Sequence, residues 1–361
     1  MYHKVDVEEK LLIISESDGT TNHHHSNVDE DGHDDKDQGG CKMLWFAAMH
    51  ESTCGKESHS YALYYSVALQ SALENARDTL EPILILGRYG LLNENSTEST
   101  KFGTWAKERG VKVLYSPRLS FQEDIPNTNN LAHQQGPFLR LDIPTFIREH
   151  DLMDMPGVCQ NHVLYTDVDV VFANRITQTD VRLLTNSVGE GITSYGREFS
   201  KGPDIMNTGV MVIHVERFEQ ELPFILQTGR DTVPYPGNDQ ELLNLYKTAN
   251  DTAKEKFQLL PMQYNWKAYW GLEPSDFSQI KVVHFHGPKL GRGLEEMATC
   301  NVTGISSNLH PHLQKAYGPH LHQGICCDYG RTAKWNMKAI RYWEASMDDL
   351  CDVKDDPIVQ T

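Results

Sequence analysis

The chain lacks any apolar run long enough to span a membrane. None of its 361 residues falls in a stretch approaching the roughly 18–20 apolar residues that a transmembrane helix needs. The short cluster LLII at residues 11–14 is also below the length of a signal-peptide apolar region. We therefore expect a soluble chain with no membrane span.

Positive charge is scarce as well. Lys and Arg number 33 against 50 Asp and Glu, which gives a formal net charge of −17, and no basic run is present. A polyanionic partner such as nucleic acid is therefore not expected. Much of the acidity falls in residues 1–40, where apolar residues become rare after residue 20, so we expect a disordered acidic tail. The histidines at 23–25 fit a solvated tail better than a specific metal site.

The seven cysteines include no C-x-x-C pair, which removes the usual spacing of a zinc or redox motif. Cys326 and Cys327 are adjacent, and Cys300 and Cys351 flank them. The sequence leaves two alternatives open: reduced thiols, or one or two disulfides in this C-terminal part. Asn-x-Ser/Thr tripeptides, which are weak indications of a secretory lumen, begin at three positions: Asn95, Asn250 and Asn301.

Apolar runs of strand length alternate with segments of helical spacing from about residue 43 onward. The predicted strands are residues 43–49, 81–87, 111–116, 163–172, 191–196, 209–215 and 281–287. The predicted helices are residues 61–76, 104–110 and 137–150, the last with a break at Pro144. This alternation predicts an α/β fold with a mainly parallel sheet flanked by helices. Ligands of such sheets bind beyond the carboxyl ends of the strands.

The run VLYTDVDVVF at residues 163–172 contains two carboxylates, Asp167 and Asp169. Residues two apart share one face of a strand, and the pair could equally lie where the strand opens into a loop. Two carboxylates so close repel each other unless a cation lies between them, and Mg²⁺ or Mn²⁺ prefers such oxygen ligands. The apolar flanks argue against a solvated surface turn. His284 and His286, late in the last predicted strand, fall at the same edge, and either could be a further ligand.

The motifs of this chain, taken in order, resemble those of glycosyltransferase family 8, the retaining nucleotide-sugar enzymes that include glycogenin and bacterial lipopolysaccharide galactosyltransferases. The similarity covers about residues 43–290. Its segments are WFAAM with the helix that follows, FLRLDIP (138–144), VLYTDVDVVF (163–172), PDIMNTGVMVI (203–213), NDQELLN (238–244), LLPMQYNW (259–266) and VVHFHGPK (282–289).

The resemblance implies a GT-A fold, the nucleotide-diphospho-sugar transferase fold, in residues 41–290. The disordered tail would precede it, and residues 291–361 would form a C-terminal extension packed on it. It also implies a retaining transferase that moves a hexose or pentose from a UDP-sugar to a hydroxyl of a carbohydrate, lipid or protein acceptor, with Mn²⁺ or Mg²⁺ as cofactor. Members of the family work in the cytosol or in the Golgi, and the sequence does not choose between them.

The resemblance also implies the roles of single residues. Asp167, Asp169 and His284 would bind the metal, His284 being favoured over His286 by the family pattern. Asp239 and Gln240 would lie beside the anomeric carbon. The substrate-binding set would be Ala47, Ala48 and Tyr61 for the base, Gly287 and Lys289 for the phosphates, Arg140 for the diphosphate or sugar, and Asp204 and Asn207 for sugar hydroxyls.

Retention is explained in the family by front-face displacement, in which the departing phosphate helps to deprotonate the acceptor. A double displacement would need a nucleophile, for which Asp239 is the one candidate. Structural alternatives also stay open: Arg140 could pair with Asp142 or Glu149, Asp204 could be a turn residue, and Asp239 could be a helix N-cap.

The closing loop departs from the family pattern, because Leu-Gly follows Lys289 in place of Pro-Trp and the spacing from His284 is one residue short. Two other functions remain as alternatives. A sugar-phosphate nucleotidyltransferase would need a Gly-rich basic loop after the first strand, and residues 50–60 hold one Gly and one Lys. A catalytically inactive nucleotide-sugar-binding protein would keep the fold without turnover.

Overall fold

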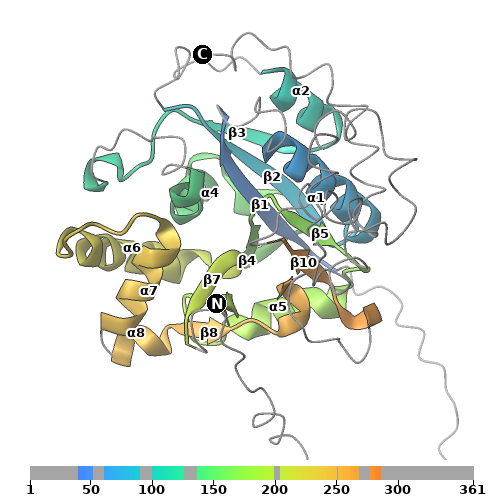
Figure 1. Cartoon of the computed structure of the whole chain (residues 1–361). Helices are drawn as coiled ribbons and strands as arrows, with labels where there is room; N and C mark the ends of the chain where they lie inside the picture. The colour runs from blue at the N-terminus through green and yellow to red at the C-terminus, as the bar shows by residue number, and fades with distance from the viewer. Residues whose placement is uncertain are drawn as a thin grey trace, which may run out of the picture. The chain divides into compact units, whose positions relative to one another are not determined.

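The computed structural model describes residues 40–51, 61–89, 100–125, 136–198, 204–249, 251–267 and 277–285. These residues form a seven-stranded sheet of order β3-β2-β1-β4-β7-β6-β8 and a three-stranded sheet of order β5-β10-β9 (Figure 1). No helix within these ranges combines the length and the apolar character that crossing a membrane requires.

The larger sheet has a parallel half and a mixed half. In the parallel half lie β1 (Lys42–His50), β2 (Leu80–Gly87), β3 (Lys112–Ser116) and β4 (Val158–Thr166). In the mixed half, β7 (Met206–His214) runs antiparallel to both β4 and β6 (Thr193–Arg197), and β8 (Phe257–Leu259) is parallel to β6. The predicted α/β class, with a mainly parallel sheet flanked by helices, is confirmed.

Helices cover both faces of this sheet (Figure 1). Residues of α1 (Tyr61–Asn75), α2 (Lys101–Glu108) and α5 (Gln178–Val188) share one apolar core with Trp45 and Ala47 of β1. The other core joins Phe46 and Ala48 to the remaining helices, α4 (Ile143–Glu149), α6 (Val215–Arg230), α7 (Asp239–Ala249) and α8 (Asp251–Glu255). Burial on both faces explains why β1 reads as a continuous apolar run without alternation.

One sequence prediction is confirmed and another differs from the structure. The helical segment 137–150 is divided at Pro144, because a 3-10 turn at Leu139–Asp142 ends before it and α4 begins with Pro144 in its first turn, which has no N–H partner to lose. The run 163–172 is not one strand: β4 ends at Thr166, and β5 (Val170–Phe172) pairs antiparallel with β10 (Val282–His284) in the small sheet. β9 (Trp266–Lys267) completes that sheet, parallel to β10.

A disulfide joins Cys41 and Cys159 across a Cα–Cα distance of 4.9 Å, next to the first residues of β1 and β4. The sequence reading did not single out this pair, and the alternative of seven reduced thiols is wrong. The cysteines of the C-terminal part lie outside the described residues. So do the acidic tail up to residue 39, the three Asn-x-Ser/Thr tripeptide asparagines and the extension 291–361.

Candidate active site

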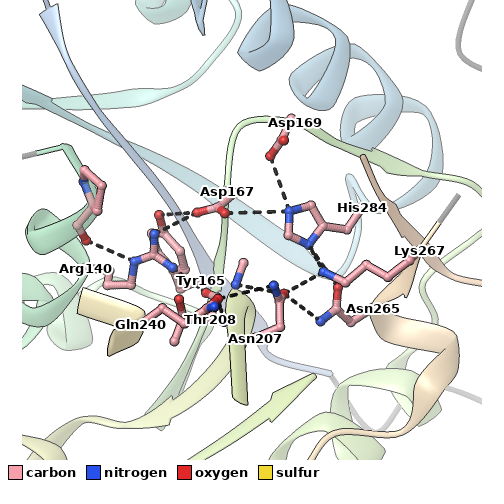
Figure 2. Close-up of polar contacts among 12 residues, drawn as sticks. Arg140, Tyr165, Asp167, Asp169, Asn207, Thr208, Gln240, Asn265, Lys267 and His284 are labelled. Atoms are coloured by element: carbon pink, nitrogen blue, oxygen red, sulfur yellow. Dashed lines mark hydrogen bonds and ion pairs between the residues drawn. The ribbon is translucent and has the colours of Figure 1, made fainter. Parts of the chain in front are cut away.

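Asp167, Asp169 and His284 meet where the two sheets adjoin (Figure 2). Asp167 follows the last residue of β4, and its N–H donates to the carbonyl of Gly209 in β7 at 2.7 Å. The carbonyl of Asp169, just before β5, accepts from the N–H of Phe285 at 2.9 Å. These backbone bonds fix both carboxylates beside His284, the last residue of β10. The carboxylates thus lie where the strand opens, one of the two arrangements that the sequence allowed.

The three side chains have the donor set and the spacing of a divalent-metal site. Their nearest ligand atoms all lie within 4.8 Å of one another, and the His284 Nε2 is 3.4 Å from Asp169 Oδ1 and 3.6 Å from Asp167 Oδ2. In an octahedral site with bonds of about 2.1 Å, ligand atoms are about 3.0–4.2 Å apart. The residues therefore fit a metal such as Mg²⁺ or Mn²⁺. Within the described ranges, this is the one such cluster of three.

The imidazole of His284 is held in its neutral form. Its side chain is fully buried, and burial, followed by the charge of Lys267, lowers the pKa of His284 to about 4. The absence of a side chain at Gly209 makes room for the ring, because a Cβ there would lie 1.9 Å from His284 Cε1. This close approach gives a physical reason for glycine in the Asn-Thr-Gly segment that the sequence reading singled out.

Arg140 joins the metal-ligand cluster to α7. Its Nη2 donates to Asp167 Oδ1 at 2.9 Å, and its guanidinium lies over the Tyr165 ring (Figure 2). Its Nε pairs with Asp239 Oδ2 at 3.0 Å. Burial alone would lower the pKa of Arg140, but the charges of Asp167 and Asp239 raise it, so the group stays a cation. The alternative pairing with Asp142 is wrong, because Asp142 accepts from Ser120.

Asp239 and Gln240 begin α7 on the opposite side of Arg140. Burial raises the pKa of Asp239 to about 6 against the opposing effect of Arg140, and the carboxylate is 2% exposed. Gln240 Oε1 accepts from the Thr208 N–H at 3.2 Å and from Asn207 Nδ2 at 3.3 Å. Asp239 is not the N-cap, since Asn238 accepts from the Glu241 N–H at 2.9 Å.

Asn207 is the centre of a buried polar network that the sequence reading did not foresee (Figure 2). Its Nδ2 donates to Glu198 at 3.1 Å, and its Oδ1 accepts from Lys267 at 2.6 Å and from Asn265 at 3.3 Å. Asn265 fits because Gly196 lacks a Cβ, which would fall 1.6 Å from Asn265 Nδ2. Asn265 belonged to the Tyr-Asn segment noted in the sequence, whereas Lys267 and Glu198 carried no signal.

The remaining predicted substrate residues are more scattered. Ala47 and Ala48 are buried in β1, and Tyr61 begins α1. Asp204 lies in a turn before β7, as the structural alternative for it expected, and its carbonyl accepts from Lys247 at 2.6 Å. Gly287, Lys289 and His286 lie outside the described residues, so their roles remain predictions.

A buried ion pair at the carboxyl ends of β1 and β2 also escaped the sequence reading. Arg88 Nε lies 2.6 Å from Glu51 Oε2, and its guanidinium stacks 3.7 Å from the centre of the Tyr115 ring. Both charged side chains are almost wholly buried. This pair therefore fixes the edge of the sheet where the chain leaves β1.

Comparison with known proteins gives likenesses of structure only. No protein-family model and no curated protein sequence matches the chain. Solved structures with similar backbones include WbbM, a bifunctional glycosyltransferase, with 12% identity, 70% of this chain covered and a TM-score of 0.48. The glycosyltransferase GlyE of Streptococcus pneumoniae gives 14% identity, 86% coverage and a TM-score of 0.48. Mouse xyloside xylosyltransferase 1 gives 15% identity, 69% coverage of this chain and a TM-score of 0.45.

The matched part is 47% of the WbbM chain, 63% of GlyE and 98% of the mouse enzyme. This chain thus matches about half to two thirds of the length of the first two. With identities this low and TM-scores under 0.5, the likenesses assign neither a family nor an activity. The functional argument therefore rests on the site.

Proposed function

We propose that the protein is a Mn²⁺-dependent, retaining glycosyltransferase that moves a sugar from a UDP-sugar to an acceptor hydroxyl. The observation that carries the proposal is the group of Asp167, Asp169 and His284 at the carboxyl edge of the large sheet, the edge where ligands of such sheets bind. The order of the sequence motifs supports the same reading. Mn²⁺ suits this group because it accepts imidazole as well as carboxylate oxygen.

Each polar residue of the site has a proposed task. A divalent metal held by the three ligands would neutralise negative charge on the leaving nucleoside diphosphate. Arg140, fixed between Asp167 and Asp239, places a second permanent positive charge beside the carboxylates. Gln240 and Asn207 are amides oriented by hydrogen bonds, and we propose that they order sugar hydroxyls. Lys289 and Gly287 are proposed to contact the phosphates, and Ala47, Ala48 and Tyr61 the base.

The position of Asp239 favours front-face displacement over a covalent intermediate. Its carboxylate is buried and paired with Arg140, so it is poorly placed for attack on an anomeric carbon. We infer that Asp239 instead holds Arg140 in place. The acceptor hydroxyl would then be deprotonated on the face from which the diphosphate departs.

The first experiment is donor hydrolysis by the purified protein. UDP-glucose, UDP-galactose, UDP-xylose, UDP-glucuronate and UDP-N-acetylglucosamine are supplied in turn, with Mn²⁺ or with chelator, and UDP release is measured. Release from one donor that stops with chelator supports the proposal and identifies the sugar. Absence of release from all donors, together with absence of metal-dependent UDP binding, refutes it. Nucleotide binding without turnover over a broad acceptor panel would indicate the inactive binding protein.

The metal assignment has its own test. Asp167→Asn keeps an oxygen that can accept from Arg140 but loses a charged metal ligand, so Mn²⁺-dependent release should fall about 100-fold or more with the fold intact. The matched control is Asp142→Asn, a buried aspartate bonded to Ser120, which should keep its rate. Normal rate and normal Mn²⁺ dependence in Asp167→Asn would contradict the assignment.

A further inference from the structure

Lys267 is a completely buried lysine in contact with the proposed metal ligand His284. It lies beside His284 because β9 and β10 are parallel and these two residues are in register. Its Nζ is 2.6 Å from His284 Nδ1 and 2.6 Å from Asn207 Oδ1 (Figure 2). The ammonium therefore reaches the ring on the side opposite to the carboxylates.

Asn265 reaches the same ring nitrogen from the other direction. Its Oδ1 is 3.1 Å from His284 Nδ1, while its Nδ2 donates to Asn207 Oδ1 and so fixes which end of the amide faces the ring. An ammonium can only donate a hydrogen bond, and an amide oxygen can only accept one. Lys267 therefore requires Nδ1 without a proton, whereas Asn265 requires Nδ1 with a proton.

The state of Nδ1 decides what Nε2 can do. A neutral imidazole carries one proton, on one nitrogen or the other. When Lys267 donates to Nδ1, the proton is on Nε2 and points toward Asp167 and Asp169, 3.6 and 3.4 Å away. When Nδ1–H donates to Asn265, the Nε2 lone pair faces the carboxylates, which is the arrangement that a metal requires.

We propose that Lys267 and Asn265 are positioning residues that set the metal affinity of this site by opposing each other at His284 Nδ1. Asn265 stabilises the tautomer that binds metal, and Lys267 stabilises the tautomer that does not. The change conserves protons: Nε2 gives one to water, Nδ1 takes one, and Lys267 keeps its own proton and its bond to Asn207. The inference rests on the proposed function for the identity of the metal site.

The opposition gives the site a lower affinity than its three ligands would have alone. Residues that orient a metal-binding histidine typically change metal affinity by about 10- to 100-fold. Lys267 changes the metal affinity in the unusual direction, because it weakens metal binding. A negatively charged nucleotide that also contacts the metal would then raise the metal affinity, so that the metal and the nucleotide bind together.

The test uses Mn²⁺ alone, with free Mn²⁺ followed by electron paramagnetic resonance in the full-length protein. Lys267→Met keeps the length of the side chain and removes the donor, and should tighten Mn²⁺ binding about tenfold. Asn265→Leu keeps the branching and removes the acceptor, and should weaken binding about tenfold. The matched control is Lys247→Met, which replaces a second buried lysine that donates to Tyr195 and to the carbonyl of Asp204. The Mn²⁺ affinity of this variant should stay within about twofold of the wild type.

A second measurement reads the tautomer directly, and its decisive reading is made on the wild-type protein. Nitrogen-15 shifts of the histidine side chains, with the His284 signal identified by its loss in His284→Gln, should show metal-free wild type protonated on Nε2. Lys267→Met should show the proton on Nδ1.

The proposal is overturned by equal or weaker Mn²⁺ binding in Lys267→Met, or by metal-free wild type protonated on Nδ1. Absence of Mn²⁺ binding by the wild type overturns both this inference and the proposed function. If Lys267→Met binds Mn²⁺ more tightly and Asn265→Leu more weakly than the wild type, while no UDP-sugar is hydrolysed, the proposed activity fails and this inference stands.

Discussion

Replacing Gly209 by alanine tests whether the ring of His284 must lie against β7 to bind metal. The added Cβ would be 1.9 Å from His284 Cε1, and ordinary contact begins at 3.4 Å, so the ring must retreat by about 1.5 Å. Metal–ligand bonds tolerate only about 0.2 Å of error. His284 should therefore be lost as a ligand, and Mn²⁺ affinity should fall by a factor of about 10–100.

The assay is the Mn²⁺ titration, accompanied by thermal unfolding without metal. Gly136→Ala is the matched control, since its Cβ would come no closer than 3.5 Å to any described atom, and it should bind like wild type. Overpacking at Gly209 will also lower stability by about 1–3 kcal/mol, so the affinity is compared at a temperature where both variants are folded. Wild-type Mn²⁺ affinity in a folded Gly209→Ala protein would refute the placement of His284.

Two further predictions concern stability. Reduction of the Cys41–Cys159 disulfide should lower the free energy of unfolding by about 3–5 kcal/mol, because the bond closes a loop of 118 residues; a urea midpoint unchanged by reductant would contradict this. Burial lowers the pKa values of His162 and His214, whose rings are 4.8 Å apart; the charges of His214 and Arg217 lower that of His162 further, and the charge of Arg217 lowers that of His214. Below pH 6.5 the unfolded chain takes up these protons first, so stability should fall as the pH drops. Replacing both histidines (His162→Gln with His214→Asn, which keeps the N-cap of α6) should flatten that fall between pH 7.5 and 5.5, and an equally steep fall would refute the assignment.

The sequence predicts the parts of this fold whose burial is uniform. Residues 43–49 of β1 are all apolar because helices cover both faces of the sheet, and that pattern needs no knowledge of the partners. The break between β4 and β5 could not be predicted in the same way. Val170–Phe172 are as buried as the strand before them, and only their pairing with β10, more than 100 residues later, places them in another sheet. α5 is absent from the predicted helices, although the capping box of Thr177 and Asp180 is a local signal for its start.

The residues of the site also differ in how far the sequence could indicate them. The two aspartates and the two histidines late in the last predicted strand are residue types whose chemistry indicates a metal, and the resemblance of the motifs favoured His284 over His286. Lysine is ordinarily a surface residue, so nothing in the letters around Lys267 indicates burial. Its place depends on Asn207 in β7 and on its register with His284 in β10, which are facts of tertiary structure.

The three proposed metal ligands come from two different sheets, and this has a mechanical consequence. Asp167 belongs to the end of the large sheet, whereas Asp169 and His284 flank strands of the small one. An ion bound by all three would act as a crosslink between two separately hydrogen-bonded layers. Substitutions inside the three-stranded sheet, such as at Val283 next to His284, would then change the ligand spacing without removing a backbone hydrogen bond of the large sheet.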